Sequence, residues 1–246
     1  MTSYIFSSFQ YSMKLVHNSP VCDVCSTEFN PIFKHLTKGE LERFNYEKTC
    51  TSHSRGDIIY NESSRINGCY CVHSGIVKIY KTGIDGKEQI IRFAKPGDII
   101  GYRSILSNEL ACTSAKILED SILCYISSEL LISLVKNNGN FSMEIMKLTC
   151  KELGEANAYI TDIAQKTVRE RLAEVLIHLK DNFGLDHENI LRIYLTREEL
   201  ANIVGTATES VIRLLSEFKN DRLIELNGRK IKILDGGGLR KIANLF

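Results

Sequence analysis

Residues 196–219 read TREELANIVGTATESVIRLLSEFK, and this stretch predicts two short helices joined by a tight turn. Thr196 and Glu199 have the spacing of a capping box, in which each side chain satisfies a backbone N–H at the start of a helix. Gly205 falls where the chain must leave the first helix, and glycine tolerates the positive φ that such a turn requires. Apolar residues recur at helical spacing on the inner face of both helices: Leu200, Ile203, Val204, Val211, Leu214, Leu215 and Phe218.

The second helix is expected to start near Thr206 and to carry polar side chains on the outer face of its first turns. These side chains are Thr208, Glu209, Ser210 and Arg213. An arginine can donate two hydrogen bonds to guanine, and a glutamate can accept one from the cytosine amino group. The set therefore suits a helix that reads bases in the major groove of DNA. The alternative is an amphipathic helical hairpin whose charged face is only solvated.

A two-stranded hairpin is predicted directly after the two helices. Leu223–Leu226 and Lys230–Ile233 alternate as strands do, and Asn227-Gly228 between them is a strong turn signal. Helix, turn, helix and hairpin together make a winged helix. From residue 213 onward basic residues outnumber acidic ones by eight to four, although the whole chain carries only +1. This basic end predicts phosphate contacts, made at the wing tip by Arg229 and Lys230.

Length and composition fit a chain of two modest domains. The 246 residues are 43% hydrophobic and 25% charged, which is the ordinary level for proteins that build a core in water. No apolar run approaches the length of a membrane span, and the first twenty residues lack a secretory signal pattern. We therefore expect a cytoplasmic protein with no membrane partner. Its eight cysteines are then expected to be reduced thiols or metal ligands rather than a disulfide framework.

Short strands and turns are predicted from about Cys50 to Ile126. Turn signals such as Asp85-Gly86 and the run KPGD at 95–98 separate stretches of β-branched and apolar residues. This texture is typical of a sandwich or jelly-roll barrel. A cupin-like barrel enzyme would need clustered metal ligands, but the six histidines show no paired spacing, so we do not expect an enzyme.

One long helix is predicted from Ser142 to about Gln165, a stretch without proline. Residues that step by three and four along it have the seam spacing of a coiled coil: Met146, Thr149, Leu153, Ala156, Ile160 and Ile163. We expect this seam to join two copies of the chain, because helix-turn-helix proteins usually span two half-sites. The alternative is a helix that packs on its own barrel.

The chain is thus expected to contain three parts. Residues 1–141 form an N-terminal arm and a sensor β-barrel, residues 142–166 form a dimerisation helix and hinge, and residues 167–246 form a winged-helix DNA-binding domain. Within the last part, a strand over Ile190–Leu195 is expected to lead into the winged helix.

In this order of parts, the sequence resembles the CRP/FNR family of bacterial transcription regulators. The resemblance is carried by TESVIR at 208–213, SGIVKIY at 74–80 and KPGDIIG at 95–101. It implies an α+β fold with a cyclic-nucleotide-binding-like barrel and a homodimer. It also implies a double-stranded DNA operator with two-fold symmetry as ligand, and RNA polymerase as a partner. The rival interpretation is a winged helix that binds protein rather than DNA.

The resemblance also bears on cAMP as the signal. Family members that bind cyclic nucleotides follow the barrel glycine with a glutamate for the ribose, and later use an Arg-Ser pair for the phosphate. Here Tyr102 follows Gly101, and Cys112-Thr113 stands where the pair would fall. A cyclic phosphate would lack its bidentate arginine partner, so cAMP is not expected.

The oxygen-sensing branch of the family holds an iron–sulfur cluster on N-terminal cysteines and one barrel cysteine. By this resemblance Cys22, Cys25 and Cys124 are candidate ligands of a metal or cluster, and Pro31 occupies the place of a further N-terminal cysteine. Four cysteine ligands are the usual requirement. Substitutes could come from elsewhere in the chain: Cys50, Cys69, Cys71 or Cys112. The alternative is that all of these are plain thiols and that the barrel is an empty sensor or a sensor of an unknown ligand.

Overall fold

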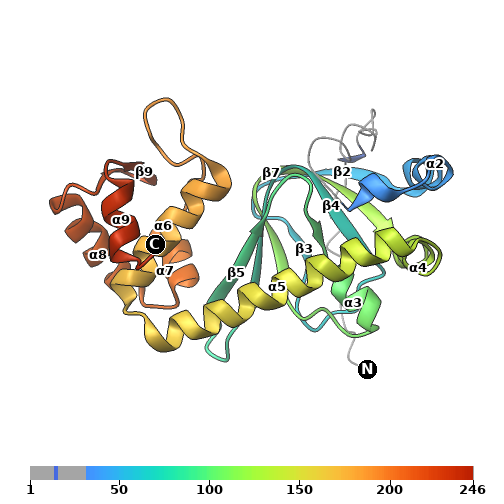
Figure 1. The fold of residues 1–246 in the computed structure, drawn as a ribbon, viewed down its shortest axis with the longest axis horizontal. Coiled ribbons are helices and arrows are strands. Elements are labelled where there is room, and N and C mark those ends of the chain that lie inside the picture. Colours follow the sequence, from blue (N-terminus) through green and yellow to red (C-terminus); the bar gives the residue numbers. More distant parts are fainter. Residues whose placement is uncertain (1–13, 16–31, 246) are drawn as a thin grey trace, which may run out of the picture. The chain divides into compact units, whose positions relative to one another are not determined.

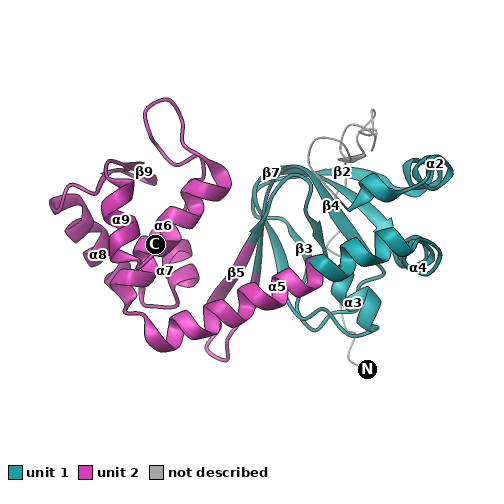
Figure 2. Ribbon diagram, in the orientation of Figure 1, with its two compact units in different colours: residues 1–79, 93–147 teal, residues 80–92, 148–246 magenta. Residues whose placement is uncertain are grey.

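The computed structural model describes residues 14–15 and 32–245, which fall into two compact units (Figure 1 and Figure 2). The first unit takes its residues from 1–79 and 93–147, and the second from 80–92 and 148–246. The contacts therefore divide the chain inside the long helix, between residues 147 and 148. The cysteines of the CxxC pair, Cys22 and Cys25, lie outside the described residues.

Within the described residues, seven strands form one sheet: β1 Lys14–Leu15, β2 Thr49–His53, β3 Ile58–Tyr60, β4 Gly68–Thr82, β5 Glu88–Ala94, β6 Ile99–Ile100 and β7 Ser114–Ser127. Their order is β1-β2-β7-β4-β5, with β3 also paired to β7 and β6 to β4. Neighbours in the sheet are thus often distant in sequence, as crossing connections in a jelly roll require. The α+β class predicted from the sequence is confirmed.

The core of the first unit lies against the long strands β4 and β7. Its buried residues are Tyr60, Val72, Val77, Ile79, Ala94, Ile100, Ala111, Ala115, Ile117 and Leu123. Gly75 in β4 has φ +84, and a Cβ there would collide with the Ser121 side chain and the Asp120 carbonyl of β7. Only glycine permits both that backbone conformation and this close approach of the strands.

Short helices accompany the strands of the first unit: η1 Phe33–His35, α2 Lys38–Glu47, α3 Tyr102–Ser107 and α4 Ser128–Asn137. Thr37 and Glu40 form a full capping box at the start of α2. Phe33 packs on Phe44 of α2 and on Phe141, with ring centroids 4.8 Å and 6.0 Å apart. Phe141 belongs to α5, Gly139–Gln165, the long helix predicted from the sequence.

The C-terminal part of the second unit is a winged helix, as predicted (Figure 1). Its elements are α6 Val168–Phe183, α7 Arg197–Val204, α8 Thr208–Asn220, β8 Ile224–Asn227, β9 Lys230–Ile233 and α9 Gly236–Ile242. Its core consists of Leu172, Leu176, Leu200, Val204, Val211, Leu215, Phe218, Ile224, Ile231 and Leu239.

The strand predicted over Ile190–Leu195 is wrong. Ile190 and Leu191 form only isolated bridges, to Lys232 and Leu185. The alternation seen in the sequence has another origin, because Leu191, Ile193 and Leu195 turn inward to the core without a continuous partner strand. Among the described residues, no helix combines the length and the apolar character needed to cross a membrane.

Candidate nucleic-acid interface

The first helix of the predicted hairpin is fixed at both ends by its sequence. At the start of α7, Thr196 Oγ1 accepts a hydrogen bond from Glu199 N at 3.1 Å, and Glu199 Oε2 accepts one from Thr196 N at 2.7 Å. At its end, Gly205 adopts a left-handed conformation with φ 71. The capping box and the glycine stop are therefore both confirmed, and they set the length of α7.

The second helix, α8, begins at Thr208, two residues later than predicted. Ala207 occupies the capping position and has no side-chain oxygen to hold the first N–H groups. The predicted inner face is confirmed, because Val211, Leu214, Leu215 and Phe218 are all buried. This anchoring sets which face of α8 remains open to a ligand.

The outer face of α8 carries the predicted base-reading residues. Glu209 and Arg213 are one turn apart and exposed, while Thr208 and Ser210 are partly exposed in the first turn. Arg213 keeps 66% of its side chain accessible and pairs with Glu217, one turn further on, at 2.6 Å between Nη1 and Oε1. The structure thus brings the predicted set together on one helix face, and it adds an acidic partner for Arg213.

The wing carries the predicted phosphate-binding residues at its tip. Asn227 of β8 pairs with Lys230 of β9, so the turn is formed by Gly228 and Arg229 rather than by Asn227 and Gly228. Gly228 has φ 58, which favours glycine at the first turn position. Arg229 and Lys230 are exposed, and Lys230 Nζ lies 5.9 Å from the centre of the Tyr194 ring. Both cations are therefore available to an anionic ligand.

Arg197 is a residue of the site that sequence reasoning missed. From the first position of α7, its Nη2 donates to the Gly228 carbonyl oxygen at 2.9 Å and so ties the helix pair to the wing turn. Burial lowers the pKa of Arg197, and its Nη1 has no hydrogen-bond partner among the described residues. A basic residue beside a helix cap is common, and only the fold places this one beside the wing.

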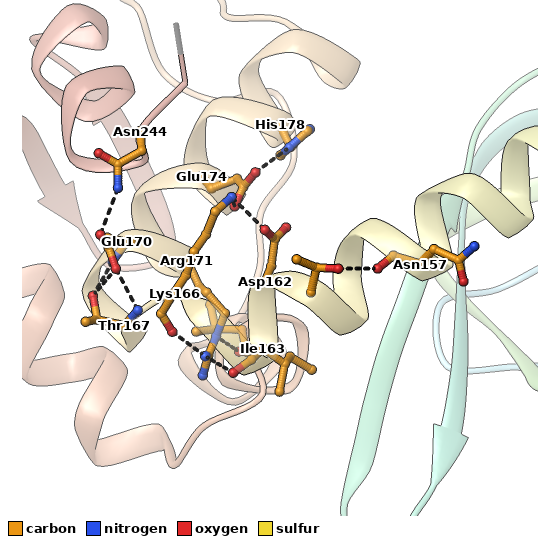
Figure 3. Close-up of polar contacts among 12 residues, drawn as sticks. Asn157, Asp162, Ile163, Lys166, Thr167, Glu170, Arg171, Glu174, His178 and Asn244 are labelled. Carbon is orange, nitrogen blue, oxygen red and sulfur yellow. Dashed lines mark hydrogen bonds and ion pairs between the residues drawn. The ribbon is translucent and has the colours of Figure 1, made fainter.

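The junction between α5 and α6 is held by an ion-pair cluster that the sequence did not reveal (Figure 3). Lys166 Nζ lies 2.8 Å from Asp162 Oδ1 of α5 and 2.7 Å from Glu174 Oε2 of α6. Partial burial opposes the charge on Lys166, but its hydrogen bonds to the two carboxylates raise its pKa above the usual value. Lys166 therefore joins the last turn of α5 to the second turn of α6.

Arg171 adds a second connection at the same junction (Figure 3). Its Nη1 donates to the carbonyl oxygen of Lys166, just after α5, at 2.9 Å and to that of Ile163, in the last turn of α5, at 3.3 Å. Its Nε donates to the Val204 carbonyl oxygen, at the end of α7, at 3.0 Å. One guanidinium thus satisfies orphan carbonyls from two helix ends.

α6 is anchored at its start and to the C-terminus of the chain. Thr167 and Glu170 form a capping box there, and Glu170 Oε1 accepts a hydrogen bond from Asn244 Nδ2 at 2.8 Å. The hydrogen bonds from Thr167 lower the pKa of Glu170. The sequence predicted a hinge at the end of residues 142–166, but the hydrogen bonds and ion pairs at this junction depend on contacts that spacing alone does not predict.

The predicted nucleotide position of the barrel is occupied by an aromatic side chain. Gly101 has φ 80, and Tyr102 after it begins α3 with only 1% of its surface exposed. Tyr102 is therefore buried at the sequence position where the resemblance places a ribose-binding glutamate.

Cys124, a predicted cluster ligand, is bonded to Cys50. The two residues face each other in the register of β2 and β7, and both are buried. The expectation of reduced or metal-bound cysteines is thus wrong for this pair, which is 74 residues apart in sequence. The sequence could not foresee the pairing without the strand register.

The described residues do not provide a cluster site. No group of three or more Cys, His, Asp or Glu side chains gathers within the described part of the chain. Burial raises the pKa of the Cys69 thiol to about 12, so this thiol is protonated at neutral pH in the metal-free chain. Cys22 and Cys25 lie outside the described residues, so the remaining ligands of the predicted set are not in view.

Both the barrel and the winged helix match models of known protein families. Residues 50–138 match the model of the cyclic nucleotide-binding domain, and residues 170–242 match that of the Crp-like helix-turn-helix domain. The chain is 27% identical to the transcriptional activator protein FnrA of Stutzerimonas stutzeri over 191 residues, covering 77% of this chain and 78% of the relative.

Two further similarities extend this result. The fumarate and nitrate reduction regulatory protein of Vibrio cholerae is 28% identical over 194 residues, which covers 78% of this chain and 77% of that one. The solved structure of FixK2 from Bradyrhizobium japonicum superposes with a TM-score of 0.72 at 23% identity, covering 79% of this chain and 96% of that one. The structural match supports the fold.

Proposed function

We propose, from the premise that this chain belongs to the CRP/FNR family of DNA-binding transcription regulators, that it acts as a homodimer on a two-fold symmetric DNA operator. Family membership makes it a non-enzymatic regulator with a helix-turn-helix that binds DNA. The proposal concerns the finer points: which residues read the operator, how two copies meet, and what the barrel senses.

The observation that carries the reading proposal is the polar outer face of α8 beside the basic wing tip. Arg213 would donate to a guanine and Glu209 would accept from a cytosine amino group, because both lie on one exposed helix face. Thr208 and Ser210, in the first turn, are placed for a base or a phosphate. Base contacts specify sequence, whereas phosphate contacts only position the protein.

At the wing tip, Arg229 and Lys230 would touch phosphate, because both are exposed cations at the end of the hairpin. Such contacts contribute affinity that does not depend on sequence and that falls with added salt. Mutations in the wing are therefore expected to lower affinity for all DNA sequences, whereas mutations in the reading face of α8 are expected to lower sequence preference.

The dimer proposal rests on the apolar stripe of α5. The seam residues are all exposed in the single chain: Met146, Thr149, Leu153, Ala156, Ile160 and Ile163. Among them Leu153 is 61% exposed and Ile160 is 65% exposed. A row of large apolar side chains left in water on one helix favours a partner surface, and a second copy supplies the same row in return.

We infer that the barrel senses a signal other than cAMP, and that cysteine redox state is the candidate. Cys50 and Cys124 form a cross-strand pair inside the barrel. A low-molecular-weight disulfide would oxidise the two thiols by exchange: one new S–S bond forms in the protein, and the oxidant takes up two electrons and two protons as two thiols. The rival signal is an iron–sulfur cluster held through Cys22, Cys25 and Cys124, and it requires that the Cys50–Cys124 disulfide be reduced first.

Spectroscopy separates these two signals. Anaerobically purified protein that is brown and contains iron and sulfide, and that is bleached by Cys22→Ser, would favour the cluster. Colourless protein without iron after anaerobic reconstitution would leave thiol chemistry. In either case cAMP is expected to leave the melting temperature unchanged, because a ligand that binds only the folded state must raise it.

Two consequences of the family assignment complete the proposal. A regulator of this family would act beside RNA polymerase at promoters, and we infer a cytoplasmic location, where a bacterial chromosome is reached. The competing function is a winged helix that binds protein instead of an operator. A mobility shift with operator DNA that weakens with salt would exclude that alternative.

Paired variants test the reading residues. Arg213→Ala should cost about 1–3 kcal/mol per half-site and relax the preference at one base position. Lys230→Ala should weaken all sequences alike and reduce the salt slope by about one unit. Titrations against operator and scrambled DNA at several salt concentrations measure both effects. If Arg213→Ala lowers the affinity for operator and scrambled DNA equally, Arg213 does not read a base. If it lowers neither affinity, α8 is not part of the DNA interface.

A further inference from the structure

We propose that Glu217 is a positioning residue that holds Arg213 ready for its base, and this inference rests on the proposed reading role of Arg213. Glu217 lies one turn after Arg213 on α8 and accepts from Arg213 Nη1 through Oε1 at 2.6 Å. Its other oxygen, Oε2, accepts from Arg169 Nη1 at 2.9 Å. Each carboxylate oxygen of Glu217 therefore serves a different arginine.

Arg169 is itself held in place by further contacts, so its hydrogen bond to Glu217 restricts the motion of the Glu217 side chain. Arg169 stands on α6 and gives its Nη2 to Asp221 Oδ2 at 2.8 Å. Its guanidinium carbon also lies 4.9 Å from the ring centre of Phe218, which is fully buried. Two hydrogen bonds and a cation–π contact thus hold one end of the chain Arg169–Glu217–Arg213 against the core.

The other end of this chain reaches the reading face. Arg213 uses one Nη1 hydrogen for Glu217, and its guanidinium carries further N–H groups in the same plane for a guanine. A long arginine side chain ordinarily loses rotamer freedom when it binds. Because Glu217 already restricts Arg213 in the free protein, less freedom is left to lose on the operator.

The negative charge of Glu217 weakens binding to DNA of any sequence, whereas its contact with Arg213 favours binding to the operator. A carboxylate on the reading helix repels phosphates, so its removal should leave non-specific binding unchanged or make it tighter. The positioning role therefore predicts that Glu217→Ala separates two quantities: preference for the operator falls while affinity for scrambled DNA does not. A loss of folding would lower both together.

The test measures binding of the full-length protein to three DNAs: operator, operator with the guanine of the Arg213 position replaced, and scrambled DNA. Glu217→Ala should reduce the preference for guanine by about 2- to 12-fold per half-site, the range for ordering one rotamer-rich side chain. Glu217→Gln keeps one acceptor oxygen and should restore part of the preference. Glu225→Gln, which removes a charge on β8, is the matched control and should leave the preference as in the unaltered protein.

A double variant checks that the two arginines act through the same carboxylate. Arg169→Ala should lower the guanine preference in the same direction, and adding it to Glu217→Ala should cause little further loss. Unchanged or increased guanine preference in Glu217→Ala would overturn the inference. If Arg213→Ala itself leaves the guanine preference intact, the proposed reading function fails first, so the two failures are distinguishable.

Discussion

Replacing Ile160 by alanine tests the proposed dimer seam most directly. In the single chain Ile160 exposes 65% of its surface, which a partner helix would cover. Full burial of an isoleucine is worth about 1.5–3 kcal/mol, so covering about two thirds of it on each of two protomers contributes about 2–4 kcal/mol. Ile160→Ala should therefore raise the dissociation constant of the dimer by about 30- to 700-fold.

Ile160→Glu should weaken the dimer further, because it places two like charges at a desolvated seam without partners. Sedimentation across a range of protein concentrations measures both variants. Lys151→Glu is the matched control, since residue 151 lies two and a half turns from residue 160 and so on the opposite face of α5. Its exposed side chain lies 3.8 Å from Glu155, measured between Lys151 Nζ and Glu155 Oε1. Ile160→Glu protein that sediments as a dimer would refute the seam.

Three further outcomes are expected. Lys166→Met should lower the stability of the C-terminal unit by about 1–3 kcal/mol in thermal melts, because it leaves buried Glu174 without its closest cation. The pKa of Lys166 is raised above its usual value of about 10.4. The stability that Lys166 contributes to the unaltered protein should therefore persist through neutral pH and be lost only as pH rises through that raised pKa. Glu170→Gln should make the decrease in melting temperature between neutral and acid pH smaller than in the unaltered protein. The lowered pKa of Glu170 contributes stability that is lost as pH falls below about 4.3. A series of thermal melts from neutral to acid pH in both proteins measures this difference. Reduction of the Cys50–Cys124 disulfide should cost about 2–4 kcal/mol in denaturant unfolding, and Cys50→Ser should be insensitive to the reductant.

The parts of the fold that the sequence predicted are those governed by local rules. The start of α7 follows from Thr196 and Glu199, three residues apart, and its end follows from Gly205. The inner face of α8 follows from a period of 3.6, which any helix must obey. The order of barrel, long helix and winged helix was predicted from such local patterns, and the family resemblance followed from that order.

The missed parts join residues that lie far apart in the chain. Arg197 reaches Gly228 across 31 residues, and Arg169 reaches Glu217 across 48. Cys50 meets Cys124 only because of the register between β2 and β7. No periodicity or spacing encodes these contacts, since each depends on how whole elements pack. The candidate site was therefore predictable as a set of reading residues, but its supports were not.

The position of Arg171 has a consequence for the DNA that the proposed dimer could accept. Its guanidinium donates to carbonyl oxygens at the ends of α5 and α7, so the helix pair cannot rotate relative to the end of α5 without breaking these hydrogen bonds. Half-sites one helical turn apart are separated by about 34–36 Å, and one inserted base pair rotates a half-site by about a tenth of a turn. A flexible joint would absorb that rotation, whereas a pinned one would not. Operators with altered spacer length should accordingly bind poorly, and a variant without the Arg171 guanidinium should tolerate them better.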